Sequence, residues 1–315
     1  KLYDEFVCIS HMVERELTSI VNTNVSSAVA WPKDVLPRGE NTSPANGSGP
    51  IVIMTGDDIR KNTFGGLAGV AAASAGAETR DVVVLGMAGQ QTRVHHWSIA
   101  AAMRPGEATT VDRISDQEMH DLLANASLVV VPSFDEGLSL PVIEAVRAGA
   151  PVVASDIPSH RELIGTGSFL ADPTSPASLA KAIRAHERKA STQQRQMTKL
   201  ASHQHEDLES VMAGKALQVS ANPDVPTQPT RKKATGERLT IAVAGPWPPQ
   251  RSGVADFTYA TITELAKIAD VTVFATADAE ATLETAPLDD LYERADDFDV
   301  VIAILGNSHF HLPML

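Results

Sequence analysis

Short, unbroken apolar runs rich in valine and isoleucine recur along the chain, and most are followed by a loop and then a longer amphipathic stretch. Because these runs do not alternate with polar residues, they are typical of parallel strands that are buried on both faces. Strands separated by helical stretches predict an α/β fold with doubly wound parallel sheets. We expect strands over residues 5–9, 51–54, 82–85, 128–131, 151–155, 169–171, 239–244, 271–275 and 299–304.

Capping residues mark the starts of several predicted helices. Ser10 precedes one helix, and Ser115 forms a capping box with Glu118 ahead of another. The same spacing recurs at Ser159 and Glu162, which predicts a second capping box. Holding its own helix end is therefore a sufficient structural explanation for Glu162.

The most informative stretch runs from residue 127 to residue 165. An apolar strand over 128–131 leads into a loop, and Ser139 is a suitable N-cap for a helix that carries Pro141 in its first turn. That helix ends before Gly149, and a second buried strand follows over 151–155. This order is a βαβ unit, whose loop lies at the carboxyl edge of the sheet, where such sheets bind ligands.

Two features of this loop indicate a ligand with phosphate and hydroxyl groups. The amides of Gly137, Leu138 and Ser139 lead into a helix N-terminus, which is a natural site for a phosphate. Glu136 lies beside them, and Glu144 follows eight residues later, so that both carboxylates can border one cleft. A carboxylate beside an anion is costly unless it binds hydroxyls, which favours a nucleotide sugar. For an isolated pair of glutamates, a structural explanation, with one as a helix cap and the other as a solvated helix residue, is favoured over the functional one.

Residues 132–165 closely resemble the signature of glycosyltransferase family 4, the retaining nucleotide-sugar enzymes of the GT-B fold. In that family Pro-Ser precedes EGFGLP, then EA, a glycine, PVV and a later Glu-x-x-Gly. The matching residues here are Pro132-Ser133, EGLSLP from Glu136 to Pro141, Glu144-Ala145, Gly149, Pro151-Val152-Val153, and Glu162 to Gly165. Leu138 replaces the usual aromatic residue and Ser139 the usual glycine.

The resemblance implies a role for each carboxylate. Glu136 would be the catalytic-site residue that holds hydroxyls of the donor sugar beside the anomeric carbon, and Glu144 would bind the ribose hydroxyls. Front-face retention leaves no protein nucleophile to assign. We expect no metal and no cofactor, because a lysine and backbone amides can neutralise the leaving diphosphate.

The loop after the strand at 51–54 supplies the expected cations. In the resembled family an arginine and a lysine from this loop bind the donor diphosphate, and Lys61 matches the lysine in its Lys-Asn context. Arg60 is its neighbour and a second candidate. The family arginine is absent, since Asp57 stands in its place. Without the motif, two basic residues at a helix start would be read as solvated.

Two other kinds of site are excluded by spacing. The loop from Gly86 to Gly89 is not G-x-G-x-x-G, which argues against a dinucleotide site. His95, His96 and Trp97 are consecutive and cannot all face one site, and no further ligand has zinc spacing.

The charge and composition of the chain limit the kinds of partner and compartment that we expect. The net charge of −13 argues against nucleic acid or an anionic membrane as the main partner. The single cysteine, Cys8, excludes an internal disulfide and fits a reducing compartment. No apolar run approaches the roughly 18 residues of a membrane span. We expect a cytoplasmic protein, with peripheral association of the full-length protein at the inner face of the plasma membrane left open.

Four segments follow from these patterns. Residues 1–49 resemble the tail of an N-terminal Rossmann-like domain and its connection, and residues 50–218 the donor-binding domain. Residues 219–236 have the composition of a linker. Residues 237–315 resemble the beginning of a second family 4 enzyme, in which Gly253 and His311 would belong to substrate loops.

This order predicts a fragment of a tandem two-enzyme protein. The predicted activity is transfer of a hexose, mannosyl or glucosyl, from a nucleotide sugar to a glycan or lipid-linked acceptor in polysaccharide synthesis. The chain begins with Lys1, and we expect this piece alone to bind the nucleotide sugar without transferring the hexose. The alternatives are a non-catalytic nucleotide-sugar-binding scaffold and, less in keeping with the EGLSLP pattern, a GT-B nucleotide-sugar epimerase.

Overall fold

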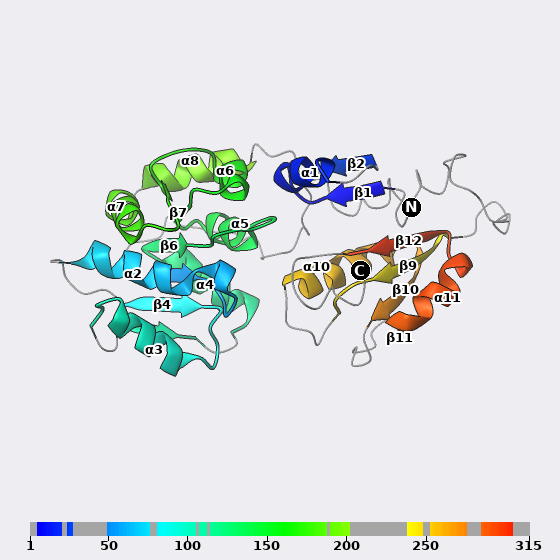
Figure 1. Ribbon diagram of the computed structural model, residues 1–315, viewed down its shortest axis with the longest axis horizontal. Helices are drawn as coiled ribbons and strands as arrows, with labels where there is room; N and C mark the ends of the chain where they lie inside the picture. Colours follow the sequence, from blue (N-terminus) through cyan, green and yellow to red (C-terminus); the bar gives the residue numbers. More distant parts are fainter. Residues whose placement is uncertain are drawn as a thin grey trace. The chain divides into compact units, whose positions relative to one another are not determined.

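The computed structural model describes residues 5–20, 24–27, 49–75, 81–104, 107–111, 114–187, 190–201, 238–247, 253–275 and 285–304. The chain divides into two compact units (Figure 1). One contains Val7–Val29 and Asp34–Gln204, and the other contains Lys1–Phe6, Ala30–Lys33 and His205–Leu315. The predicted linker at 219–236 lies outside the described residues. The boundaries and identities of the four segments predicted from the sequence remain predictions.

The first unit is built on a six-stranded sheet in which every neighbouring pair is parallel. Its strands are β3 (Ile51–Met54), β4 (Val82–Leu85), β5 (Ala108–Thr110), β6 (Leu128–Val131), β7 (Val152–Ser155) and β8 (Leu170–Ala171). They are ordered β5-β4-β3-β6-β7-β8 across the sheet. This is the order of a doubly wound Rossmann-type sheet, and it confirms the predicted fold class.

Helices cover both faces of this sheet. All residues of β3, β6 and β7 are buried, as a sheet covered on two sides requires. The helices are α2 (Thr63–Ser74), α3 (Gln91–Ala100), α4 (Asp116–Asn125), α5 (Leu140–Arg147), α6 (Pro158–Ile164), α7 (Pro176–His186) and α8 (Ala190–Ala201). Helix α2 contacts α3 and α7, whereas α5 contacts α4, α6 and α8. Close packing on the α2 face depends on Gly66, where a Cβ would lie 2.9 Å from Pro132.

A short segment precedes this domain. Strand β1 (Glu5–Cys8) pairs with β2 (Asn24–Ser27), and helix α1 (His11–Thr18) lies between them in the chain. Ser10 is the N-cap of α1, as predicted, and its hydroxyl accepts a hydrogen bond from the amide of Val13.

The two predicted capping boxes have different outcomes. The box formed by Ser115 and Glu118 at the start of α4 is confirmed in full. The box at Ser159 is wrong, because Pro158 takes a first-turn position and Ile157 becomes the N-cap of α6. Glu162 is then too far along the helix to reach its start.

The second unit contains a four-stranded parallel sheet in the order β11-β10-β9-β12. Its strands are β9 (Thr240–Ala244), β10 (Asp270–Ala275), β11 (Thr285–Pro287) and β12 (Val300–Ala303). The other elements are α10 (Gly253–Leu265), α11 (Leu291–Arg294), and the 3-10 turns η2 (Leu288–Asp290) and η3 (Ala295–Asp297). Strand β9 lies between β10 and β12, which is the arrangement at the switch point of a doubly wound sheet.

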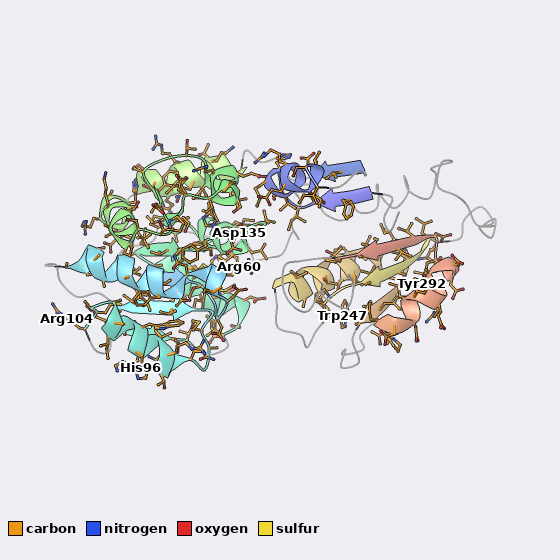
Figure 2. The ribbon with its side chains drawn as sticks, viewed as in Figure 1. Arg60, His96, Arg104, Asp135, Trp247 and Tyr292 are labelled. Carbon is orange, nitrogen blue, oxygen red and sulfur yellow. The ribbon has the colours of Figure 1, made fainter. Side chains whose placement is uncertain are left out.

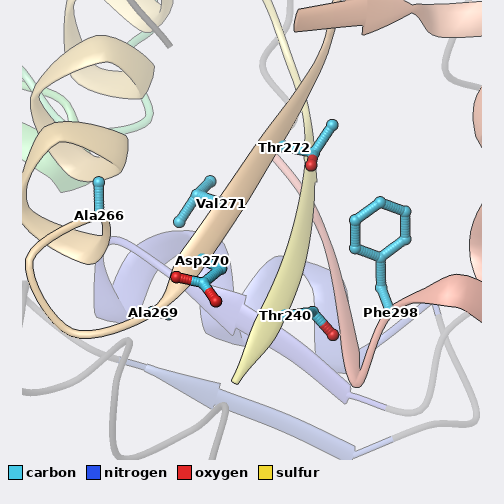
Figure 3. Close-up of a pocket in the computed structure, with 7 residues that line it drawn as sticks. All are labelled: Thr240, Ala266, Ala269, Asp270, Val271, Thr272 and Phe298. Atoms are coloured by element: carbon cyan, nitrogen blue, oxygen red, sulfur yellow. The ribbon is translucent and has the colours of Figure 1, made fainter. Parts of the chain in front are cut away.

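A hollow of about 420 Å³ in the second unit lies between the β9–β10 edge and Phe298 (Figure 3). Thr240 and Asp270, which line it, are the first residues of their strands. Doubly wound sheets bind ligands at the opposite, carboxyl edge, so this hollow is not the candidate functional site.

Strands β3 and β6 are adjacent although β4 and β5 come between them in the chain. The crossovers turn in opposite directions from this pair, and in sheets of this order the ligand crevice lies between the loops that leave the carboxyl ends of the two strands. These are the β3–α2 loop (residues 55–62) and the β6–α5 loop (residues 132–139). The fold therefore brings together the two loops that the sequence singles out.

Asn62 joins both loops to the domain, and its replacement tests how the crevice is held. Asn62 has a left-handed backbone (φ 51°), accepts a hydrogen bond from the Gly65 amide, and donates to the carbonyls of Pro132 and Pro173 at 3.0 and 2.9 Å. Asn62→Ala should lower the free energy of unfolding by about 3 kcal/mol, since it loses a cap, strands two carbonyls and leaves an alanine in a strained conformation.

Urea denaturation at constant pH measures this effect. Asn62→Gly should cost about 1 kcal/mol less than Asn62→Ala, because glycine adopts this backbone freely. The control is Asn125→Ala, which removes one exposed hydrogen bond to the Asp121 carbonyl. Equal losses in Asn62→Ala and Asn125→Ala would contradict the role of Asn62.

Candidate functional site

The two loops are joined by their backbones as well as by Asn62. The Phe134 amide donates a hydrogen bond to the Arg60 carbonyl at 2.7 Å. Figure 2 shows Arg60 and Asp135 on these neighbouring loops. The side chain that follows Arg60 therefore lies against the loop that carries Glu136.

Lys61 and Glu136 form an ion pair across the crevice. Lys61 Nζ donates to Glu136 Oε1 at 2.7 Å, and Ser133 Oγ donates to the same oxygen at 2.7 Å. Glu136 is only 6% exposed, whereas the Lys61 side chain is 22% exposed. Both donors converge on Oε1, and Oε2 accepts no hydrogen bond from the described residues. The ion pair therefore places the Lys61 ammonium group next to Oε2 of Glu136, an oxygen that can still accept a hydrogen bond from a ligand.

Backbone amides provide the second element of the site. Ser139 is the N-cap of α5, and the amides of Val142 and Ile143 donate to its carbonyl. The three preceding amides, those of Gly137, Leu138 and Ser139, donate to no group within the part of the chain that the structure describes. Consecutive unpaired amides that lead into a helix N-terminus are an anion-binding arrangement.

Ser139 caps α5 without a side-chain hydrogen bond to the helix, which differs from the usual serine cap. Its hydroxyl lies 3.1 Å from Nε2 of His160, and Nδ1 of His160 lies 2.9 Å from the Ser155 carbonyl. Since a carbonyl can only accept, Nδ1 carries the ring proton and Nε2 accepts from Ser139. Through this hydrogen bond, His160 fixes the side chain of Ser139, the last residue of the β6–α5 loop.

Burial keeps this histidine neutral. His160 is fully buried, and desolvation lowers its pKa to about 4, although the Ser155 carbonyl and the charge of Glu136 oppose the shift. A neutral ring is the form that can accept from Ser139. The hydrogen bond is therefore intact at neutral pH.

The other predicted donor-binding residues lie near this centre in different settings. Arg60 pairs with Asp58, its Nη2 lying 3.2 Å from Oδ2, and the Arg60 amide holds the pKa of Asp58 below its usual value. Asp57, which stands where the resembled family has arginine, pairs with Arg93 of α3. Glu144 is half-buried in the second turn of α5.

Two predicted residues belong to the second unit. Gly253 is the first residue of α10, which follows β9. His311 lies outside the described residues. The carboxyl ends of β9 and β12 are paired at Ala244 and Ala303, so the loops that leave them start from the switch point of that sheet.

The described residues contain no group of three or more His, Cys, Asp or Glu side chains that could hold a metal ion. His95 and His96 both lie on α3, with ring centroids 6.2 Å apart (His96 is labelled in Figure 2). In the same part of the chain, no helix has both the length and the apolar character needed to cross a bilayer.

Sequence reasoning missed Ser133, Asn62 and His160 as parts of the site. Ser133 stands three residues before Glu136, a spacing that could have suggested a local hydrogen bond. His160 follows β7 at the same edge of the sheet as Ser139, which is the only signal that sequence could have offered for it.

Known proteins share sequence with the part of the chain that carries these two loops. A family model described as "Glycosyl transferases group 1" matches residues 45–216, more than half of the chain. O-antigen chain mannosyltransferase B of Escherichia coli is 33% identical over 92 residues, which is 29% of this chain and 24% of that protein. MMP alpha-(1->4)-mannosyltransferase of Mycolicibacterium hassiacum is 40% identical over 68 residues, or 22% of this chain and 16% of that protein.

Solved structures show the same fold. The S. aureus TarM mutant in complex with UDP superposes with a TM-score of 0.52 at 12% identity, over 62% of this chain and 39% of that chain. The chain spans about a quarter or less of the length of the two mannosyltransferases.

The buried neutral state of His160 predicts a pH dependence of stability. Its pKa is about 4 in the folded protein and near 6.5 when unfolded. The unfolded chain therefore takes up the proton first as pH falls, so stability is full above pH 6.5 and is lost as pH falls toward 4. The loss is on the order of 3 kcal/mol by linkage.

Urea unfolding between pH 7.5 and pH 4, followed in wild type, His160→Gln and His11→Gln, isolates this contribution. His160→Gln should reduce the pH dependence in this window, whereas His11→Gln, which changes an exposed ring, should preserve it. Parallel curves for all three proteins would contradict a buried neutral His160.

Proposed function

The chain belongs to the group 1 glycosyl transferases, and from this membership we propose that it binds a nucleotide sugar between its β3–α2 and β6–α5 loops. The whole protein then transfers the hexose, with retention of the anomeric configuration, to a glycan or lipid-linked acceptor in polysaccharide synthesis. The observation that carries this proposal is the Lys61–Glu136 pair beside the three unpaired amides of residues 137–139.

Charge explains why this arrangement suits a sugar diphosphate. Helix-terminal amides and Lys61 supply positive potential without a proton transfer, and they can stabilise the charge that develops on a leaving diphosphate. Glu136 already neutralises Lys61 in the free protein. The ammonium group is therefore held in place before the ligand arrives, and it is shared with the phosphate once the ligand is bound.

Glu136 is suited to hold the sugar and poorly suited to attack it. Its Oε1 already accepts hydrogen bonds from Lys61 and Ser133, so the lone pairs that a nucleophile would need on that oxygen are occupied. Oε2 remains able to accept from a sugar hydroxyl. We assign Glu136 the role of orienting the donor sugar beside the diphosphate, and we assign no protein nucleophile.

The remaining assignments concern the nucleoside and the sugar. Glu144, on the helix that follows the amides, would bind the ribose hydroxyls. The names of two relatives, both mannosyltransferases, favour a mannosyl donor over a glucosyl one. Arg60 would be a secondary phosphate contact, because its guanidinium is engaged by Asp58.

Isothermal titration of the chain with GDP-, UDP- and ADP-sugars tests the proposal. One of these donors should bind with a 1:1 stoichiometry, and its nucleoside diphosphate should compete with it. Failure of all nucleoside diphosphates and their sugars to bind at millimolar concentration would overturn the proposal.

Replacing Lys61 should separate the phosphate contribution from that of the nucleoside. Lys61→Met should weaken binding of the preferred nucleoside diphosphate at least tenfold, about 1.4 kcal/mol, while the free nucleoside changes less than twofold. Only the phosphates interact with that charge. Lys181→Met, an exposed change on α7, is the control.

Because Lys61→Met leaves Glu136 buried without its cation, the double variant Lys61→Met with Glu136→Gln should be compared at the same time. The diphosphate loss should persist in the double variant. If diphosphate and nucleoside lose affinity equally in both variants, Lys61 is structural and the assignment is wrong.

Replacing Glu144 should weaken the binding of ligands that carry ribose hydroxyls. Glu144→Ala should weaken binding of the preferred nucleoside diphosphate by about 1–3 kcal/mol, the cost of leaving the ribose hydroxyls without their hydrogen-bond partner. The matched comparison is the 2′,3′-dideoxynucleoside diphosphate, for which wild type and Glu144→Ala should bind alike. An equal loss for both ligands would exclude a contact to the ribose hydroxyls.

A further inference from the structure

Helix α1 (blue in Figure 1) begins against the β6–α5 loop, although 127 positions separate Ser10 from Gly137. The Ser10 hydroxyl donates to the Gly137 carbonyl at 2.8 Å and accepts from the Val13 amide at 3.2 Å. Ser10 is 1% exposed, so water does not compete for these bonds. A Cβ at Gly137 would lie 3.7 Å from Val13, which places the helix in contact with the loop.

Glu162 fixes the same end of α1 from the other side. Its Oε1 accepts from the His11 amide at 2.9 Å and its Oε2 accepts from the Met12 amide at 3.0 Å. A carboxylate at a helix N-terminus is favoured by charge-assisted hydrogen bonds and by the helix dipole. Together with Ser10, Glu162 satisfies the first three amides of α1. The glutamate that sequence assigned to its own helix therefore caps a different one.

The hydrogen bond to Gly137 has a directional consequence for the site. In a planar trans peptide the carbonyl and the following amide point in opposite directions. Ser10 holds the Gly137 carbonyl toward α1, so the Leu138 amide must point away from α1. Leu138 is the middle residue of the three whose amides are unpaired in the described part of the chain.

From this geometry we infer that Ser10 and Glu162 are positioning residues, and that α1 fixes the orientation of the Gly137–Leu138 peptide so that the Leu138 amide is available to the donor diphosphate. This inference rests on the proposed function for the identity of the ligand, whereas the orientation of the peptide does not depend on any ligand. Helix α1 and its N-cap Ser10 thereby become part of the donor site without touching the donor.

The test uses substitutions that spare the helix. Ser10→Gly removes the hydroxyl but costs an N-cap only a few tenths of a kcal/mol, and Ser10→Thr restores a hydroxyl. Ser19→Ala, at the other end of α1, removes a hydrogen bond to the Glu16 carbonyl and serves as the matched control. Glu162→Gln keeps the acceptor oxygen but removes the charge.

Two measurements are made on each protein. Amide hydrogen exchange over residues 140–143, whose amides donate to the carbonyls of Leu138 and Ser139, is followed by mass spectrometry without ligand. It should be at least fivefold faster in Ser10→Gly than in wild type and Ser19→Ala, and slower again in Ser10→Thr. Titration with the nucleoside diphosphate that wild type binds most tightly should show a five- to tenfold loss in Ser10→Gly and a smaller loss in Glu162→Gln. The free nucleoside should bind all variants alike.

The outcomes separate the two proposals. Unchanged exchange in Ser10→Gly overturns the positioning role, whatever the ligand. Faster exchange with unchanged diphosphate affinity also overturns it, because the oriented amide would then not contribute to binding. Faster exchange in a protein that binds no nucleoside diphosphate would uphold the orientation of the peptide while rejecting the proposed function.

Discussion

The site depends on a crevice in which a buried carboxylate and a cation hold each other in place. Glu136 can be buried to 6% exposure because Lys61 and Ser133 both donate to it, and a buried carboxylate without such partners would be strongly destabilising. Sheet order makes the pair possible, since β3 and β6 are neighbours and their loops leave from the same edge. The Lys61–Glu136 ion pair forms without any ligand. It therefore holds the Lys61 ammonium group in position before an anion binds.

The β6–α5 loop is restrained from three directions. Asn62 binds its first carbonyl, Ser10 binds the carbonyl of Gly137, and His160 binds the hydroxyl of Ser139. These contacts use two carbonyls and one hydroxyl of the loop, so the amides of residues 137–139 stay unpaired within the described part of the chain. Preorganised donors of this kind stabilise charge without reorganising when it develops, which is why a rigid loop suits a leaving diphosphate.

Sequence predicted the strands well because apolar β-branched runs carry their own signal. It did not predict β5 (Ala108–Thr110) or α3, whose residues form no clear apolar run or stripe. It placed Lys61, Glu136 and the three amides together through the βαβ pattern and the family resemblance. The contacts of Ser10, His160 and Glu162 join residues 127, 21 and 151 positions apart, and local patterns contain no information on such pairs. Glu162 was misassigned because its spacing from Ser159 imitates a capping box, whereas Pro158 shifts the helix start.

A crystal structure of the chain with its preferred nucleoside diphosphate tests the central claim most directly, because it locates the phosphates. We predict that phosphate oxygens lie at hydrogen-bond distance, roughly 2.7–3.2 Å, from the amides of residues 137–139. Lys61 Nζ should then contact both a phosphate and Glu136. A nucleotide bound away from these amides, such as in the hollow beside Thr240 and Asp270, would contradict the account.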